Sequence, residues 1–302
     1  MGKPGRWWVA AIVAVVSIVA STSGVGAGVA GAQPSAGAVA QAACTLTPTA
    51  GTVVRMIGAR SYRLHVPAGI TGPNARLLVS LHGWGGTAAG HETGSGLSGF
   101  SDASKVIVAY PTGTYITLLP LPILVGWDYF HRSSPDVDFL RAVVADIAGT
   151  WCIDPHRVHA DGISMGGLMS QRLACEASDV FASVSAHATN DVTAAWFLLL
   201  PSEPCTLPRP TSVYLSCGTA DLVTNNGCAP AKDSWVARLG CPAPVATTDG
   251  FGSYTNHAPC VAGTQLAWRR WTGLGHDYPP AGAARAQWFA EMDAFFAANP
   301  KP

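Results

Sequence analysis

A serine between glycines, in the stretch DGISMGGLM (Asp161–Met169), constrains the fold of this chain more than any other feature. The pattern Gly-x-Ser-x-Gly between a strand and a helix makes a turn so tight that the serine's near neighbours must lack side chains. Gly162 and Gly166 provide that space around Ser164. The preceding RVHADG predicts a short buried strand, and MGGLMSQRLACE has apolar residues at helical spacing. The stretch therefore predicts a nucleophile elbow, although the same pattern also occurs in ordinary glycine-rich turns.

Length and composition predict one domain of ordinary α/β size. The chain has 302 residues, of which 48% are hydrophobic and 12% charged, so it can bury a large single core. The formal net charge is zero, and the sequence contains neither a basic patch nor a basic tail. We therefore expect no nucleic acid and no anionic membrane surface as a partner.

The N-terminus predicts a secretory signal peptide over residues 1–32. Lys3 and Arg6 precede the uncharged run WWVAAIVAVVSIVA, and small residues continue to an AGA that ends at Ala32. The apolar run is shorter than the roughly 20 residues of a membrane-spanning helix, so we expect no stable membrane anchor after cleavage. Cleavage is expected after Ala32, with further permissible sites up to residue 43. A flexible tail over residues 33–48 and a folded domain over residues 49–302 would follow.

The cysteines also indicate export. Their even number, 8, predicts disulfides in an oxidising compartment. A lipoprotein would instead acylate Cys44, but the QAA before it lacks the large aliphatic residue of that signal, and an odd cysteine would remain. No CxxC or ordered Cys/His cluster is present, so no metal site is expected. The cysteines are Cys44, Cys152, Cys175, Cys205, Cys217, Cys228, Cys241 and Cys260.

Strand-like and helix-like segments alternate along the chain. This order predicts an α/β fold with a mainly parallel central sheet, helices on both faces and an antiparallel hairpin at its start. Strands are predicted at residues 52–58, 61–67, 76–83, 105–111, 157–162, 181–188, 211–217 and 265–273. Helices are predicted at residues 136–151, 165–176, 233–240 and 283–298.

A serine hydroxyl is a weak nucleophile at neutral pH, so it needs a histidine to accept its proton and a carboxylate to orient that histidine. In folds with a nucleophile elbow, the acid and then the histidine follow the serine along the chain. Asp221 follows the predicted strand TSVYLSC, and His276 follows the predicted strand QLAWRRWTG. We therefore predict a triad of Ser164, Asp221 and His276, whose activity falls as His276 becomes protonated.

Other acids and histidines fit these roles less well. Asp277 is adjacent to His276, and neighbouring side chains are poorly placed to bond through the far ring nitrogen. Asp191, after the predicted strand at 181–188, stays open as an alternative acid. Structural roles are commoner for histidines close to the elbow in sequence, which are His156, His159 and His187.

Two preorganised backbone N–H groups should stabilise the oxyanion of the tetrahedral intermediate. The N–H of Met165 lies at the N-terminus of the elbow helix, where partial positive charge favours an anion. The second donor should come from the glycine-rich loop in VSLHGWGG (residues 79–86), and we predict the N–H of Trp84. His82 is expected to brace this loop by hydrogen bonds.

Six segments in chain order resemble the motifs of the secreted esterase family that includes polyhydroxybutyrate depolymerases and feruloyl and acetylxylan esterases. The resemblance runs from about Leu77 to the C-terminal helix. It implies an α/β-hydrolase fold, the triad named above, and ester hydrolysis through an acyl-enzyme without a cofactor. The segments are LHGWGG, SGFSDASKVIVAYPTGT, DVDFLRAVVADIAGTWCIDPHRV, GISMGGLMSQRLACEASDVFASVSAHA, GTADLV and GLGHDYP.

The resemblance also carries details of the site and of one disulfide. The family's cysteine positions before the last strand imply a disulfide between Cys241 and Cys260. Relatives commonly have asparagine after the nucleophile, where this chain has Met165, as many polyester and lipid hydrolases do. Relatives usually have GGGH followed two residues later by tryptophan, and Tyr278 occupies that place here as a candidate substrate contact.

Two apolar segments, Tyr115–Trp127 and Ala194–Pro201, are expected as loops near the carboxyl ends of strands, where open α/β sheets place ligands. One hypothesis is that they wall an acyl or aromatic-acid pocket, with Trp84 and Trp127 beside the ester. The alternative is that they pack on each other or form a short lid helix. Prolines in the first segment argue against a membrane helix.

Three classes of function follow from these residues. The favoured one is a secreted serine esterase that hydrolyses short acyl, hydroxyalkanoate or hydroxycinnamoyl esters, either small or polymeric. An acyltransferase would pass the acyl group to a sugar or alcohol, and exclusion of water would decide between the two. A catalytically silent binding protein would have no physical need for nucleophile, acid, base and oxyanion loop together.

Overall fold

The computed structural model describes residues 49–70, 74–118, 121–194, 202–224 and 228–302. The predicted signal peptide and tail, residues 1–48, lie outside the described residues. The same holds for residues 195–201 of the second apolar segment. Within the described part of the chain, no helix is long and apolar enough to cross a membrane.

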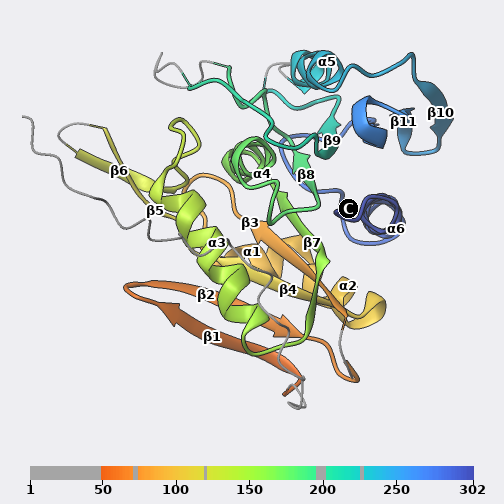
Figure 1. Ribbon diagram of the computed structural model, residues 1–302. Helices are drawn as coiled ribbons and strands as arrows, with labels where there is room; N and C mark the ends of the chain where they lie inside the picture. The colour runs from red at the N-terminus through yellow and green to blue at the C-terminus, as the bar shows by residue number, and fades with distance from the viewer. Residues whose placement is uncertain (1–48, 71–73, 119–120, 195–201, 225–227) are drawn as a thin grey trace, which may run out of the picture. The chain divides into compact units, whose positions relative to one another are not determined.

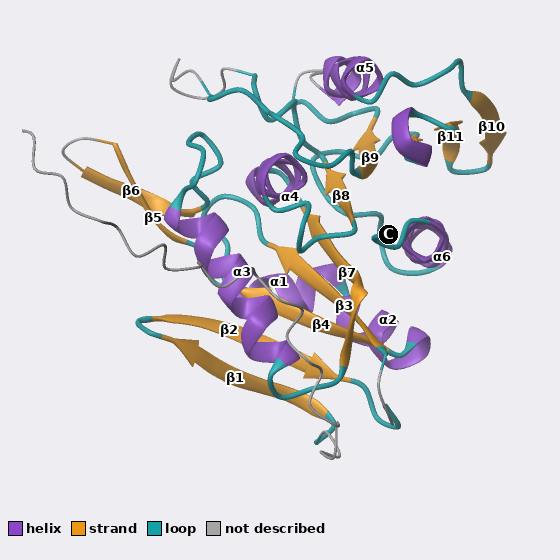
Figure 2. Cartoon of the chain, viewed as in Figure 1, coloured by secondary structure: helices purple, strands orange, loops and turns teal. Residues whose placement is uncertain are grey.

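A ten-stranded sheet organises the described residues (Figures 1 and 2). Its six central strands, from β4 to β12, run parallel, and antiparallel hairpins complete both edges. In order across the sheet, the strands are β1 (Gly51–Ile57), β2 (Arg60–Val66), β4 (Val106–Pro111), β3 (Ala75–Leu81), β7 (Ile153–Gly162), β8 (Ser183–His187), β9 (Ser212–Gly218), β12 (Leu266–Trp271), β11 (Gly252–His257) and β10 (Val245–Asp249). The prediction of a mainly parallel sheet that begins with a hairpin is confirmed.

Two hydrophobic clusters lie on opposite faces of this sheet. One cluster contains the buried residues of α3 (Pro135–Ala148), α4 (Met165–Glu176) and α5 (Cys228–Arg238). The other contains those of α1 (Ala88–Ser95), α2 (Leu97–Ser104) and α6 (Ala283–Ala298). Because the central strands are covered on both faces, they read as continuous apolar runs, such as the VIVAYP of β4.

Several elements differ from the sequence-based expectation. The apolar segment Tyr115–Trp127 does not form a loop or a lid helix, because β5 (Thr114–Leu118) pairs with β6 (Leu121–Gly126) in a separate two-stranded sheet. Its β-branched and aromatic residues favour extended backbone, and the two runs can pair with each other. The hairpin β10–β11 and the short helices α1 and α2 were not predicted, nor was a single 3₁₀ turn at Val261–Gly263.

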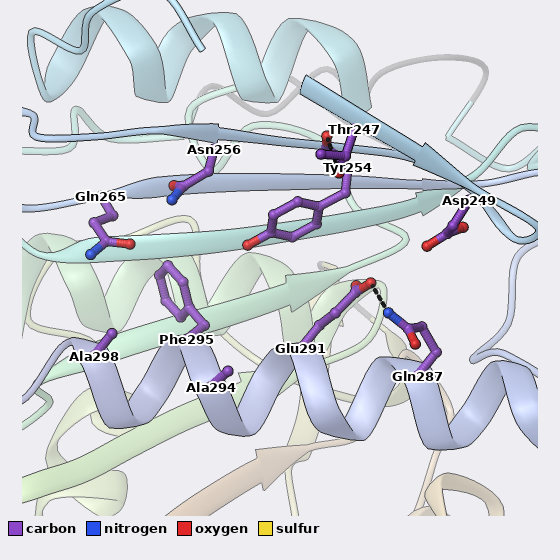
Figure 3. Close-up of a pocket in the computed structure, with 10 residues that line it drawn as sticks. All are labelled: Thr247, Asp249, Tyr254, Asn256, Gln265, Gln287, Glu291, Ala294, Phe295 and Ala298. Carbon is purple, nitrogen blue, oxygen red and sulfur yellow. Dashed lines mark hydrogen bonds between the residues drawn. The ribbon is translucent and has the colours of Figure 1, made fainter. Parts of the chain in front are cut away.

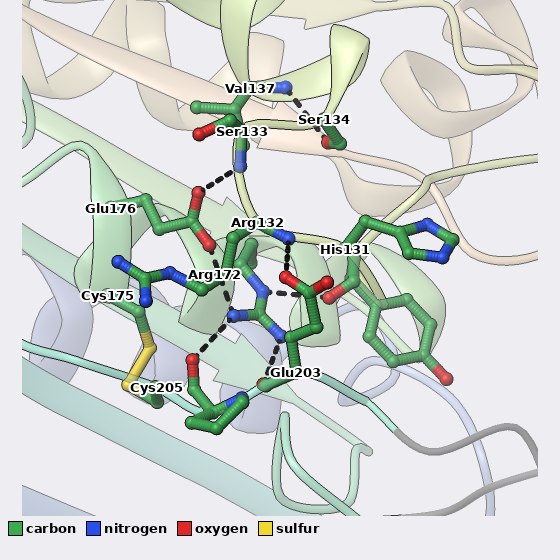
Figure 4. A network of polar contacts seen from close by, with 12 residues as sticks. His131, Arg132, Ser133, Ser134, Val137, Arg172, Cys175, Glu176, Glu203 and Cys205 are labelled. Carbon is green, nitrogen blue, oxygen red and sulfur yellow. Dashed lines mark hydrogen bonds and ion pairs between the residues drawn. A yellow bond between two sulfur atoms is a disulfide. The ribbon is translucent and has the colours of Figure 1, made fainter. Parts of the chain in front are cut away.

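Arg172 of α4 holds two loops against the elbow helix, one at Tyr129 and the other at Glu203 and Pro204 (Figure 4). Its side chain is fully buried, and its guanidinium donates to the carbonyl oxygens of Tyr129 (2.7 Å), Glu203 (2.9 Å) and Pro204 (3.2 Å). Burial lowers the pKa of Arg172, and the ion pair with Glu176 at 3.1 Å opposes this effect only in part. These contacts therefore stabilise the packing of both loops against α4.

Three disulfides join six of the seven cysteines that the structure describes, and Cys152 is also disulfide-bonded. Cys241 is bonded to Cys260, which is the pair that the resemblance implied. The disulfide between Cys175 and Cys205 connects α4 to one of the loops held by Arg172. The third, between Cys217 at the end of β9 and Cys228 at the start of α5, closes the loop that contains Asp221.

Candidate active site

The serine stands on a strained turn between β7 and α4. Ser164 has φ of 56° and ψ of −119°, in the positive-φ region that residues with side chains rarely adopt. Its N–H donates to the carbonyl oxygen of His187 at 2.9 Å, which fixes the turn against β8. A Cβ atom on Gly162 would overlap the backbone of Gly166, and one on Gly166 would overlap the carbonyl oxygen of Leu81. The close packing of three backbones therefore explains both glycines.

His276 and Asp221 lie within hydrogen-bond distance of each other. His276 Nδ1 is 2.9 Å and 3.0 Å from the two carboxylate oxygens of Asp221. The backbone N–H groups of Val223 (2.9 Å) and Thr224 (3.1 Å) also donate to this carboxylate. Burial alone would raise the pKa of Asp221, but the hydrogen bonds from His276 and Thr224 outweigh it and hold that pKa below its ordinary value. An ionised Asp221 favours the His276 tautomer with its proton on Nδ1, which leaves Nε2 as the base.

Ser164 and His276 line the same small pocket. Within the described residues they share it without a direct hydrogen bond, and such catalytic contacts commonly tighten when substrate binds. Asn190 also lines this pocket, and its buried amide oxygen has no hydrogen-bond partner within the described residues. Sequence reasoning missed this residue, since only its position just after β8 marks it. The other lining residues are Leu168, Ala188, Thr189 and Thr224.

The glycine-rich loop after β3 lies directly against the serine. A Cβ atom on Gly83 would be 3.4 Å from the Cβ of Ser164. The N–H groups of Gly85 and Gly86 already donate to the carbonyl oxygens of Val125 (2.7 Å) and Gly83 (3.0 Å), so neither can serve an oxyanion. The N–H of Trp84 remains our predicted donor from this loop.

His82 braces this loop as expected. Its Nδ1 lies 2.8 Å from the carbonyl oxygen of Gly83, and its Nε2 accepts the N–H of Gly113 at 3.0 Å. Accepting through Nε2 requires the neutral ring with its proton on Nδ1, and burial lowers the pKa of His82 in the same sense. His82 therefore positions the backbone beside Ser164.

Two predicted substrate contacts lie away from the pocket. Trp127 is fully buried, and its indole Nε1 donates to the carbonyl oxygen of His82 at 2.8 Å, so it supports the glycine-rich loop from within the core. Tyr278 is 4% exposed, and its ring stacks on those of His187 and Trp288. The sequence pattern located both aromatic residues near the site, but packing turns their rings inward. Trp84, by contrast, is only partly buried and packs on the edge of the core.

His187 connects the serine turn with the histidine loop. Its backbone carbonyl oxygen accepts the N–H of Ser164, and its ring Nε2 lies 2.6 Å from the carbonyl oxygen of Asp277. The two alternative acids lie elsewhere: Asp277 is exposed, and Asp191 forms an ion pair with Arg238. Of these three acids, Asp221 alone contacts His276 among the described residues.

A carboxylic acid lies fully buried beneath the serine turn. Asp161, three residues before Ser164, accepts hydrogen bonds from the hydroxyls of Ser80 and Tyr278, both at 3.2 Å. Burial raises the pKa of Asp161 to about 6 from its ordinary 3.8, although these bonds oppose the shift. Ionisation of this group therefore costs the folded state stability at neutral pH.

We expect Asp161→Asn to make the unfolding free energy less dependent on pH. Because the folded-state pKa is raised, the wild type keeps its full stability below pH 4 and loses it as pH rises toward and past 6. The variant, which cannot ionise there, should gain about 3 kcal/mol relative to wild type between pH 4 and pH 7. Urea unfolding at several pH values measures this difference, and a difference that stays constant would contradict it.

One group of described residues has donor atoms close enough together for a metal ion: Cys217, Asp221 and Cys228. The two cysteines are bonded to each other, and Asp221 is bonded to His276, so this group does not fit a metal.

A serine on a strand-to-helix turn, with its acid and histidine after later parallel strands, defines an α/β-hydrolase fold. No family model matches the chain. The solved structure of an acetyl xylan esterase from Aspergillus awamori has a TM-score of 0.61 with 16% sequence identity, and the match covers 77% of this chain and 94% of that one. The predicted fold class is confirmed.

Sequence relatives are esterases. NocK of Nocardia uniformis subsp. tsuyamanensis, which is named a putative esterase, is 38% identical over 174 residues, covering 55% of this chain and 45% of NocK. Feruloyl esterase B of Piromyces equi is 30% identical over 165 residues, covering 53% of this chain and 29% of that protein. This chain is thus a relative of the esterases that its motifs resemble, and it spans less than half the length of either protein.

Proposed function

We propose that this chain is a secreted serine esterase that hydrolyses carboxylic esters through Ser164, His276 and Asp221. The observation that carries the proposal is the pairing of His276 with a buried, ionised Asp221 beside the pocket that Ser164 lines. The named activities of the relatives support the same reaction class.

The reaction begins when Ser164 Oγ attacks the ester carbonyl carbon and its proton passes to His276 Nε2. The N–H groups of Trp84 and Met165 donate to the carbonyl oxygen as it becomes an oxyanion, and the N-terminus of α4 adds partial positive charge there. His276 then protonates the departing alcohol, which leaves an acyl group on Ser164. Water then attacks this acyl-enzyme while His276 accepts its proton, and His276 returns that proton to Ser164 Oγ as the free acid leaves.

The pocket favours esters of small acyl groups. Its wall includes the short side chains of Ala188, Thr189 and Thr224 beside Leu168. Asn190 adds a hydrogen-bond acceptor in this otherwise tight space, which suits an acyl or alcohol part that carries a hydroxyl. Short acyl and hydroxyacyl esters are therefore the first substrate classes to test, and a hydroxycinnamoyl ester tests whether a larger acyl group is accepted.

Export is part of the proposal. The charged start, apolar run and small residues of positions 1–32 form a signal-peptide pattern. Three disulfides among the described residues suit an oxidising compartment.

The test is release of nitrophenol from acetyl, butyryl and octanoyl esters, with methyl ferulate in parallel. We expect turnover that declines with acyl length, and labelling of Ser164 by a fluorophosphonate, located by mass spectrometry of peptides. Free acid and transferred ester are both measured with glycerol present, because predominant transfer to glycerol would indicate an acyltransferase instead. Absence of both turnover and labelling would refute the triad assignment.

A further inference from the structure

A second concave site lies between the β10–β11 hairpin and α6 (Figure 3). It has a volume of about 400 Å³, within the range of about 300–1,000 Å³ typical of ligand sites. Its walls share no residue with the pocket beside Ser164. The polar lining is formed mainly by Asp249, Tyr254, Asn256, Gln265, Gln287 and Glu291.

The site is elongated. Its lining residues on α6 run from Gln287 to Ala298, which corresponds to about 16 Å along the helix axis at about 1.5 Å per residue. Figure 3 shows Asn256, Tyr254 and Asp249 in line on the opposite wall. The shape therefore suits an extended chain better than a single compact ligand.

Charge in this groove is nearly balanced. The fully buried Arg269 guanidinium contacts Asp249 at 2.9 Å and Glu291 at 3.6 Å, so it offsets part of the charge of the two carboxylates. The remaining negative charge disfavours an anionic ligand such as a nucleic acid, and the buried arginine disfavours a bare cation. A neutral ligand is the best electrostatic match.

The polar groups in the groove suit hydroxyl groups. The buried amide oxygen of Asn256 has no hydrogen-bond partner within the described residues. The amide of Gln287 donates to Glu291 at 2.8 Å and the hydroxyl of Tyr214 donates to it at 3.0 Å, so this acceptor is held in place. Amides and carboxylates can both accept hydrogen bonds from hydroxyl groups. The ring of Tyr254, between Asn256 and Asp249, offers a flat apolar surface.

We infer that this groove binds a neutral oligosaccharide chain. Tyr254 and Asn256 contact the chain from β11, and Gln287 contacts it from α6. This second site would hold a glycan at a place separate from ester chemistry, and the inference stands whether or not Ser164 proves catalytic.

The experiment titrates xylohexaose, cellohexaose and maltohexaose into the mature protein by calorimetry and by two-dimensional NMR. Ser164 is first blocked with a fluorophosphonate, or replaced with alanine if labelling fails, so that the groove is measured alone. We expect at least one hexasaccharide to bind and to shift signals of β11 and α6. Each of Tyr254→Ala and Gln287→Ala should weaken that binding by about tenfold or more.

Ser253→Ala is the matched control, since alternate residues of a strand point to opposite faces and Ser253 neighbours Tyr254. This control should bind as wild type does. Circular dichroism verifies that each variant is folded, and Gln287→Ala on the other wall keeps the test valid if Tyr254→Ala unfolds. No binding of any hexasaccharide at millimolar concentration, or equal binding by wild type and both groove variants, would overturn the inference.

Discussion

Ser164→Ala should lower kcat for nitrophenyl acetate by about 10⁴-fold to 10⁶-fold, the range found when a single residue of a catalytic triad is removed. The residual rate comes from the oxyanion donors and from substrate binding, which the substitution leaves in place. Stability should change little or increase, because alanine keeps the volume of the site and Ser164 Oγ has no hydrogen bond within the described residues.

Steady-state kinetics of wild type and variant measure this effect, with the unfolding midpoint of both proteins determined in parallel. Ser253→Ala on β11 is the control for loss of a serine hydroxyl far from the triad, and it should keep full activity. A Ser164→Ala protein that retained more than about a tenth of the wild-type kcat would exclude an acyl-enzyme at this serine.

Gly166→Ala should lower the free energy of unfolding by about 3 kcal/mol or more, at the upper end of overpacking effects. The added methyl group would overlap the carbonyl oxygens of Leu81 and His82, and rigid backbone cannot move away as a flexible side chain can. Because relief requires α4 to shift from β3, the serine turn and the glycine-rich loop should separate. We therefore expect ester turnover to fall strongly even in molecules that still fold.

Gly94→Ala provides the matched control. Gly94 lies in α1, and an added Cβ there meets nothing within 4 Å. Alanine should stabilise this exposed helix by about 0.5–1 kcal/mol, since glycine loses more backbone entropy on folding. Urea unfolding of the two variants measures both effects, and similar values for them would contradict the packing argument.

The central sheet could be predicted because burial on both faces leaves a mark in the sequence. Strands such as β4 are apolar along their length, and helices with one apolar stripe separate them. The hairpin β10–β11 left no such mark, because β10 is exposed along its whole length and burial therefore does not constrain its residues. Its pairing with β11, which in turn pairs with β12, decides its place in the sheet.

The residues of the candidate triad could be assigned from sequence because each follows a recognisable strand. Gly162 marks the turn by local sterics, because a Cβ there would meet the backbone of Gly166, whereas Gly166 is required by the distant backbone of Leu81. Asp221 could be ranked above Asp277 and Asp191 by order and spacing, and among these three acids the structure places Asp221 in contact with His276.

The orientation of the aromatic side chains was decided by tertiary structure. Trp127 and Tyr278 were expected beside the substrate from their positions near the site, yet both rings are buried. Trp127 turns inward because its N–H reaches the carbonyl oxygen of His82, and Tyr278 because its hydroxyl reaches the buried Asp161. The sequence by itself determined the turn at Ser164 and the order in which the candidate nucleophile, acid and histidine follow their strands. Both leave a mark in the sequence, through local backbone geometry and through the apolar runs of buried strands. Which side chains face the pocket depends on contacts between residues more than 40 positions apart, which only packing in three dimensions can establish.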